Sequence, residues 1–217
     1  MLSMTSRGLL KIAQRVDHYS RSRILHEYLG RAGLQGVDKI PTFTTRKELQ
    51  TLLELALACP DSASVLEIGS YLGASACYLS AGLFGRNGTL YCVDTWTNET
   101  MPGGFKDTFG EFKKNLAPVL SMIHPIRKHS GELMSQDIQT PIHLAFIDGD
   151  HSYQTTIADF QVVSPLMADE GFIALHDTRS FSGVSKALGE ILCSGKWRMA
   201  GHVENLSWLQ RADWQGG

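Results

Sequence analysis

The chain has 217 residues, of which 43% are hydrophobic and 19% are charged, and its formal net charge is −2. This length is enough for one substantial hydrophobic core, and the composition is that of an ordinary globular protein. The near balance of charge gives no basis for a nucleic-acid or membrane partner, so neither is expected. The four cysteines form no C-x-x-C pair and are expected to be buried thiols in a reducing compartment, which favours a cytoplasmic protein.

The N-terminal segment is predicted to be a helical arm or lid. Apolar residues recur at helical spacing over residues 9–16 and again over residues 24–32, before Gly33 interrupts the pattern. Such helices suit a lid, a dimer contact or simple packing, and the sequence does not choose among these roles. We therefore divide the chain into an arm, residues 1–44, and a main domain, residues 45–217, and expect that a homodimer would form through the arm.

The main domain is predicted to begin with a helix and a strand. Thr45-Arg46-Lys47-Glu48 is a capping box, which predicts a helix that continues to about Leu57. A turn at Pro60-Asp61-Ser62 leads into a strand, Ser64–Ile68. A glycine-bearing turn then leads into a helix that ends near Leu83.

The turn after this first strand carries the pattern E-x-G-x-Y-x-G-x-S, formed by Glu67, Gly69, Tyr71, Gly73 and Ser75. A turn that opens a helix presents backbone N–H groups and the positive end of the helix dipole, and glycine allows a ligand to come close. Tyr71 stands where a dinucleotide-binding turn has its second glycine, and its bulk would crowd a pyrophosphate. The acid at position 67 suits a positively charged ligand, so the turn disfavours NAD.

The second strand is predicted over Thr89–Val93, and it ends at Asp94. Asp94 follows Gly73 by about 20 residues, which is the separation that places an acid near ribose hydroxyls in nucleotide-binding folds. The polar loop that follows contains Thr95 and Trp96, and we expect it to lie beside the same ligand.

The rest of the chain alternates between strands and helices. Phe105, Phe109, Phe112 and Leu116 share one helical face and are predicted to enter the core. Further strands are predicted at Met122–Lys128, Ile142–Ile147 and Phe172–Leu175, with helices near residues 153–167 and 184–192 and a closing hairpin at residues 196–203 and 207–211. This alternation predicts a parallel α/β sheet, and the hairpin predicts an antiparallel edge.

The turn at residues 67–75 and the order of elements over residues 45–211 resemble class I S-adenosylmethionine-dependent methyltransferases. The closest resemblance is to the metal-dependent catechol O-methyltransferase-like and macrolide-sugar O-methyltransferase-like group. The resemblance implies a Rossmann-like α/β fold, with a seven-stranded, mostly parallel sheet, an antiparallel last strand, helices on both faces and an N-terminal helical extension.

The resemblance also implies S-adenosylmethionine as the cofactor. Glu67 is expected to bind its amino group and Asp94 its ribose, while Ser130 and Gly131 are assigned to adenine only by their place after the third strand. The expected cofactor contacts are Glu67, Gly69, Ser70, Tyr71, Gly73, Ser75, Asp94, Thr95, Trp96, Ser130, Gly131 and Asp148.

A second group of polar residues follows the fourth and fifth predicted strands. Asp148 ends one strand and His176-Asp177 ends the other, so these side chains should meet at the same edge of the sheet. Two adjacent carboxylates repel each other unless a cation lies between them, and Mg²⁺ suits such ligands. The resemblance implies a divalent metal held by Asp148, His176 and Asp177. His176 departs from the usual acid and favours a softer metal such as Mn²⁺, Fe²⁺ or Zn²⁺.

His151 lies three residues after Asp148, where the resemblance implies the catalytic base. An imidazole titrates near neutral pH and suits the removal of a hydroxyl proton. The structural alternative is that Asp150-His151-Ser152 only caps the next helix.

The leading hypothesis is therefore methyl transfer from S-adenosylmethionine to a hydroxyl group of a small molecule, assisted by a divalent metal and a histidine base. Three alternatives stay open. One is a NAD-linked or other nucleotide-dependent enzyme, which Tyr71 disfavours. Another is a cofactor-binding or assembly protein that keeps the fold without transferase activity. The third is a cephalosporin-hydroxylase-like enzyme, because such proteins share the D-G-D-H segment at residues 148–151.

Overall fold

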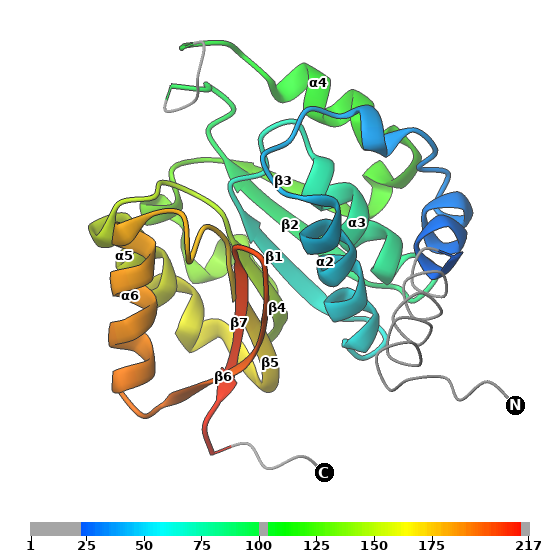
Figure 1. The fold of residues 1–217 in the computed structure, drawn as a ribbon. Coiled ribbons are helices and arrows are strands. Elements are labelled where there is room, and N and C mark those ends of the chain that lie inside the picture. The colour runs from blue at the N-terminus through cyan, green and yellow to red at the C-terminus, as the bar shows by residue number, and fades with distance from the viewer. Residues whose placement is uncertain (1–22, 100–103, 214–217) are drawn as a thin grey trace, which may run out of the picture.

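The computed structural model describes residues 23–99 and 104–213 and shows one seven-stranded sheet with helices on both faces (Figure 1). The strands are β1 (Ser64–Ile68), β2 (Thr89–Asp94), β3 (Ile123–Arg127), β4 (Ile142–Ile147), β5 (Met167–Leu175), β6 (Trp197–Val203) and β7 (Leu206–Arg211). The α-helices that position the site are α2 (Arg46–Ala58), α3 (Ala74–Leu83), α4 (Phe109–Asn115), α5 (Tyr153–Val163) and α6 (Ser182–Cys193). Short 3₁₀ turns are η1 (Val37–Lys39), η2 (Ala117–Met122), η3 (Ser130–Glu132), η4 (Ser135–Asp137) and η5 (Ser164–Leu166).

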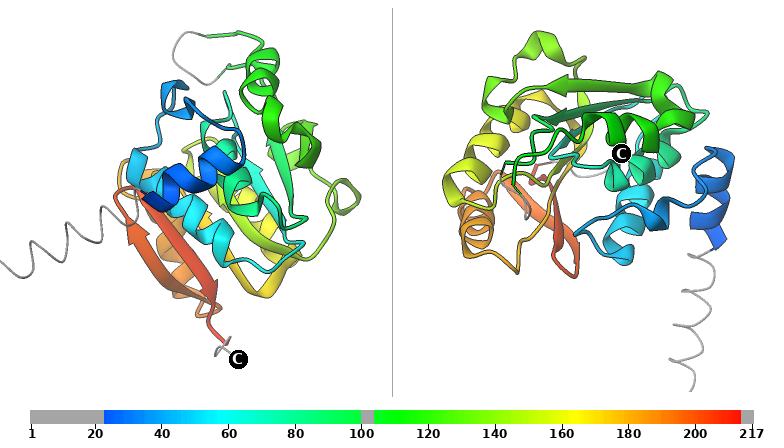
Figure 2. Two further views of the ribbon diagram at one scale, coloured as in Figure 1. Left: turned by 90° about the vertical axis from the view of Figure 1, so that its right-hand side faces the viewer. Right: turned by 90° about the horizontal axis from the view of Figure 1, so that it is seen from above.

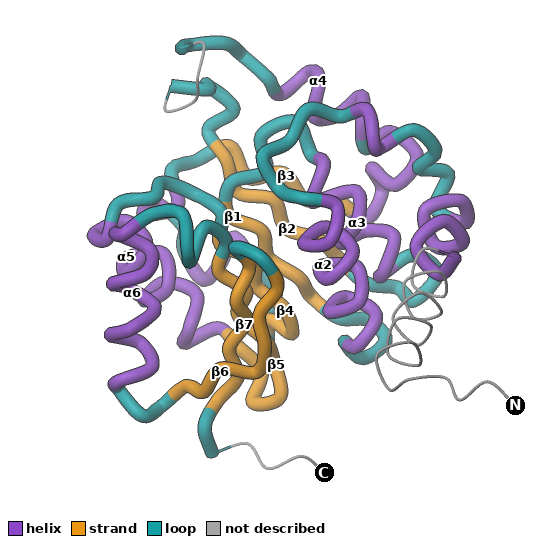
Figure 3. The backbone as a smooth tube through the Cα atoms, in the orientation of Figure 1, coloured by secondary structure: helices purple, strands orange, loops and turns teal. Residues whose placement is uncertain are grey.

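The strand order is β3-β2-β1-β4-β5-β7-β6. Figure 3 shows the strands in orange, with helices in purple around them. β1 to β5 run parallel to one another, and β7 is antiparallel to both of its neighbours, β5 and β6. The predicted seven-stranded, mostly parallel sheet with an antiparallel last strand is therefore confirmed. The closing hairpin forms one edge of the sheet as predicted, with β6 outermost and the antiparallel β7 between β6 and β5.

The two faces of the sheet carry separate hydrophobic cores. α2 and α3 pack on one face, while α5 and α6 cover the other, as the views in Figure 2 also show. Every residue of the central strand β1 is buried, because helices cover both of its faces. Of the helices in residues 23–99 and 104–213, none is both long and apolar enough to cross a membrane.

The described part of the predicted arm packs onto the first of these cores. Residues 23–31 are helical, and Leu25 and Leu29 are buried in the core that α2 and α3 form. The helical pattern at residues 9–16 lies outside the described residues. The division of the chain at residue 44 and the dimer contact both remain predictions.

Several predicted boundaries differ from the structure, and those of β5 and α4 have clear physical causes. β5 begins at Met167, five residues before the predicted start, because a register shift against β4 accommodates Glu170-Gly171 within the strand. α4 begins only at Phe109, where the Asp107 carboxylate accepts a hydrogen bond from the Phe109 N–H at 3.0 Å. Phe105 therefore lies outside the helix and is 73% exposed, so its predicted place in the core is wrong.

Candidate functional site

The candidate site lies at the carboxyl ends of the parallel strands, where open α/β sheets bind their ligands. Gly69 follows β1 with φ +86°, and a Cβ at this position would lie 2.0 Å from the Asp148 carbonyl oxygen. Only glycine fits there. The turn after β1 consequently packs directly against the turn after β4, and the two groups of residues singled out in the sequence meet at one place.

Asp94 organises the turn after β1. Its Oδ2 accepts hydrogen bonds from the Ser70 N–H at 2.9 Å and the Tyr71 N–H at 2.8 Å, and its Oδ1 accepts one from the Trp96 N–H at 2.7 Å. The Ser70 and Tyr71 N–H groups, which could otherwise bind a phosphate, are therefore already hydrogen-bonded to Asp94. The negative charge of Asp94 would also repel a pyrophosphate. This arrangement adds to the argument from Tyr71 against NAD. Asp94 Oδ1, which accepts only one of these hydrogen bonds, retains a second lone pair that a ribose hydroxyl could use.

Glu67 lies behind this turn. The side chain is 0% exposed, and its Oε1 accepts a hydrogen bond from the Ser75 hydroxyl at 2.5 Å. Within the described part of the chain, Oε2 is buried without a well-formed hydrogen bond, with Ser70 and Cys92 beside it. Burial raises the pKa of Glu67 to about 7. The structure thus places Glu67 beneath the turn, where it accepts a hydrogen bond from the Ser75 hydroxyl, and its contact with the cofactor amino group stays a prediction.

Trp96 belongs to the core. Its indole is fully buried and packs against Phe109 and Phe112, with ring centroids 4.9 Å and 4.7 Å away. The Trp96 backbone N–H donates to Asp94 Oδ1, and the contact of this residue with the cofactor stays a prediction. Thr95 is half-buried next to it.

Ser130 and Gly131 form the start of η3, beyond the end of β3. Gly131 is exposed, and a Cβ there would meet open space, so this turn is accessible. Ser130 lies beside the carboxyl group of Asp159, a residue of α5 that the sequence-based prediction missed. Burial raises the pKa of Asp159 to about 6. The sequence does offer one indication of this residue. Asp159 lies on the buried face of α5 with Thr156, Phe160 and Val163, where an acidic residue is unusual.

Asp148, His151 and Asp177 form the second cluster. One ligand atom from each lies within 4.8 Å of the others, which makes them a candidate metal group. The His151 Nε2 atom lies 3.0 Å from Asp177 Oδ2, and the His151 ring stacks on Phe181 with centroids 4.0 Å apart. The hydrogen bond to Asp177 raises the pKa of His151 above its usual value. Asp177 has φ 56°, an uncommon conformation for a non-glycine residue.

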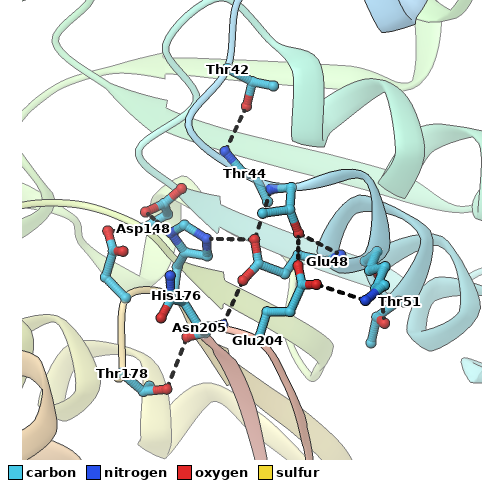
Figure 4. A network of polar contacts seen from close by, with 12 residues as sticks. Thr42, Thr44, Glu48, Thr51, Asp148, His176, Thr178, Glu204 and Asn205 are labelled. Atoms are coloured by element: carbon cyan, nitrogen blue, oxygen red, sulfur yellow. Dashed lines mark hydrogen bonds and ion pairs between the residues drawn. The ribbon is translucent and has the colours of Figure 1, made fainter. Parts of the chain in front are cut away.

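His176 is buried and is not part of this group. Figure 4 shows its ring between Asp148 and Glu48. Its Nδ1 lies 3.0 Å from Asp148 Oδ1, and its Nε2 lies 3.2 Å from Glu48 Oε2. Burial alone would lower the pKa of His176, but the hydrogen bonds to Asp148, Asp177 and Glu48 outweigh it and raise this pKa to about 12. Because both ring nitrogens are engaged with carboxylates, the geometry does not support the predicted role of His176 as a metal ligand. His151 takes its place in the group.

Glu48 is the other residue that the sequence-based prediction missed as part of the site. The sequence indicates it only as the glutamate that closes a helix capping box, and that box is present in the structure. Nothing in the local sequence indicates that the same carboxylate also reaches a histidine 128 residues further along the chain.

The strand order and the site at the carboxyl edge define a Rossmann-like methyltransferase fold, and the comparisons with known proteins agree. A family model described as a methyltransferase domain matches residues 66–178, which is more than half of the chain. The chain therefore belongs to this methyltransferase family. Among curated proteins, none matches the chain at a significant level.

Solved structures share the fold at low sequence identity. The O-methyltransferase NovP matches with a TM-score of 0.64 and 14% identity, over 78% of this chain and 81% of NovP. The methyltransferase PaMTH1 of Podospora anserina, bound to SAH (S-adenosylhomocysteine), matches with a TM-score of 0.63 and 13% identity, over 98% of this chain and 99% of PaMTH1. An rRNA methylase of Streptococcus thermophilus matches with a TM-score of 0.55 and 14% identity, over 79% of this chain and 99% of that protein. At these identities the likeness extends to the fold alone, and it does not choose an acceptor.

Proposed function

We propose that this protein transfers a methyl group from S-adenosylmethionine to a hydroxyl oxygen of a small molecule. The observation that carries the proposal is the direct packing of the Gly69 turn against Asp148, within the cluster that contains His151 and Asp177. A turn suited to a phosphate-free cofactor and a histidine–carboxylate pair thus lie side by side.

The residues of the turn fit such a cofactor. A buried Glu67 oxygen without a well-formed hydrogen bond lies beneath the turn, and its negative charge would favour a ligand that carries an ammonium and a sulfonium group. Asp94 would accept the ribose hydroxyls, and the exposed Ser130–Gly131 turn would border the adenine. When bound, S-adenosylmethionine supplies an electrophilic methyl group.

His151 is the proposed base. Its Nε2 faces Asp177, which would orient the ring, and within the described residues its Nδ1 has no hydrogen-bond partner. In this role, Nδ1 would accept the proton that the acceptor hydroxyl loses when it takes up the methyl group, and S-adenosylhomocysteine would be the second product.

Asp148 and Asp177 are the residues that would hold a divalent cation. Their oxygens belong to the same compact group as His151, and an oxygen-rich donor set suits Mg²⁺ or Mn²⁺. When bound, the cation would lower the pKa of a coordinated hydroxyl group. The base and the cation would therefore act on the same proton.

Exposed aromatic rings near these elements support an acceptor with an apolar body. Phe43 is 65% exposed, and its ring lies 6.4 Å from that of Tyr71. Phe181 is also exposed and stacks on His151. The net charge of −2 supports a small molecule over an RNA, whose phosphates would require a basic surface.

The test is transfer of a radiolabelled methyl group from S-adenosylmethionine to a panel of catechols, phenols and sugars, with an rRNA fragment as comparison. We expect methylation of at least one hydroxylated small molecule. His151→Ala should lower kcat by about 10²-fold or more while the affinity for S-adenosylhomocysteine stays unchanged. His202→Ala, at an exposed histidine of the edge strand β6, is the matched control. Normal turnover by His151→Ala would refute the assignment of the base.

A further inference from the structure

The carboxylate of Glu48 is buried at the start of α2 and contacts three separate segments of the chain (Figure 4). Its Oε2 accepts a hydrogen bond from the Thr45 N–H at 2.7 Å and lies 3.2 Å from Nε2 of His176. Its Oε1 accepts a hydrogen bond from the Asn205 N–H at 2.7 Å, in the turn between β6 and β7. Its pKa is lowered to about 2: burial alone would raise it, but these contacts outweigh burial.

Helix capping explains only one of these contacts. A capping box requires the glutamate to reach back to the N–H of the cap residue, which here is Thr45. An exposed glutamate would do this equally well, whereas burying a carboxylate is unfavourable unless several partners compensate it. The contacts with Asn205 and His176 therefore call for a role beyond the cap.

The turn between β6 and β7 is also fixed to the end of β5. Both the N–H and the hydroxyl of Thr178 donate to the Asn205 carbonyl oxygen, at 3.0 Å and 2.9 Å. Since the Asn205 N–H donates to Glu48, the segment that carries His176 and Asp177 is attached to α2 twice, once through Asn205 and once through the His176 ring.

The His176 ring connects Glu48 to the two carboxylates of the site. On the side opposite Glu48, its Nδ1 lies 3.0 Å from Asp148 Oδ1 and 3.4 Å from Asp177 Oδ2. The ring is planar and rigid, and both of its nitrogens contact carboxylates. A contact of Glu48 with Nε2 therefore fixes the position of Nδ1, which in turn contacts Asp148 and Asp177.

We infer that Glu48 is a positioning residue: through the His176 ring it holds the side chains of Asp148 and Asp177 in the arrangement that the site needs. The inference rests on the proposed function, because that proposal assigns these two carboxylates to a divalent cation. Partners that orient metal ligands in this way typically change metal affinity by about 10- to 100-fold.

The test compares Glu48→Gln with Thr45→Ala in the full chain, using Mn²⁺ as the probe. Glutamine keeps the length of the side chain but removes one acceptor oxygen, whereas Thr45→Ala weakens the helix cap and leaves the Glu48–His176 contact in place. We expect Glu48→Gln to weaken Mn²⁺ binding by about tenfold, with S-adenosylhomocysteine affinity unchanged within about twofold. Thr45→Ala should leave both affinities unchanged. Equal Mn²⁺ affinity in Glu48→Gln and the wild type would overturn the inference.

A double-mutant cycle shows whether Glu48 acts through the histidine. His176→Asn keeps a donor near Asp148 and removes the nitrogen that faces Glu48. In this background, Glu48→Gln should have no further effect on Mn²⁺ affinity. A full tenfold effect in the absence of the ring would contradict the inference.

If the wild-type protein does not bind Mn²⁺, the metal site of the proposed function is refuted. A second measurement then tests the positioning role of Glu48 without a metal. That measurement is the coupling between Glu48→Gln and Asp148→Asn in the free energy of unfolding. We expect a coupling that disappears in the His176→Asn background, although Glu48 and Asp148 share no direct contact. Strict additivity in the presence of His176 would overturn the inference independently of any metal.

Discussion

At the scale of single residues, Glu67 makes the stability of the protein depend on pH. Burial raises its pKa from 4.5 to about 7, so between these pKa values the folded protein binds the proton more tightly than the unfolded chain does. The stability that Glu67 contributes is therefore fully present below the lower pKa and declines as pH rises through the higher one. Glu67→Gln should flatten this decline, which amounts to at most about 3 kcal/mol. Urea unfolding across this pH window measures it, and parallel profiles for both proteins would contradict the account.

Gly69 offers a second prediction at this scale. Gly69→Ala combines a positive φ with a Cβ placed 2.0 Å from a backbone oxygen, so we expect a loss of several kcal/mol and of S-adenosylhomocysteine binding. Gly85→Ala is the matched control, because Gly85 also has a positive φ, +77°, but a Cβ there would meet nothing within 4 Å. The control should lose only about 1–2 kcal/mol. Equal losses, measured by thermal unfolding, would show that steric contact with Asp148 is unimportant.

The site residues could be predicted from sequence only where local pattern and strand order determine them. Gly69, Asp148 and His151 meet because each follows a strand of one parallel sheet. Glu48 could not be found in this way, because its contact with His176 depends on how α2 packs against distant strands. The local pattern also could not show that the Trp96 ring turns into the core.

At the scale of elements, the close packing of α2 against α3 depends on Gly82. A Cβ on Gly82 would lie 2.7 Å from the Cβ of Ala56 and 2.9 Å from the Leu53 carbonyl oxygen. Gly82→Ala should therefore destabilise the protein by about 1–3 kcal/mol, even though alanine favours helices. Gly189→Ala in α6 meets open space and should instead stabilise it by up to about 1 kcal/mol. Chemical denaturation compares them, and stabilisation by both changes would contradict the packing described.

Most elements follow the periodicity of their apolar residues, and β1 and β4 have the predicted bounds. The exceptions have local or pairing causes. α4 begins later than the aromatic pattern indicates, at Phe109, whose N–H donates to the Asp107 side chain. β5 begins earlier than predicted, because a register shift against β4 keeps in the strand two residues that the sequence indicates as a turn. Neither cause is visible in hydrophobic periodicity.

At the scale of the whole molecule, the described part of the arm shares a core with the main domain. Leu25 is 2% exposed within the core that α2 and α3 form. Leu25→Ala should lower the free energy of unfolding by about 2–4 kcal/mol and leave a single cooperative transition. A separate early transition, observed by calorimetry in the variant or the wild type, would show that the arm unfolds independently.

The central claim is that the turn after β1 binds S-adenosylmethionine. The measurement that tests it most directly is calorimetric titration of the full-length protein, shown to be folded by circular dichroism, with S-adenosylhomocysteine and with NAD as the comparison. We predict saturable binding of S-adenosylhomocysteine, no binding of NAD, and a loss of the first in Asp94→Ala. No heat from S-adenosylhomocysteine, or equal binding of NAD, would contradict the account and would favour a protein that keeps this fold for another purpose.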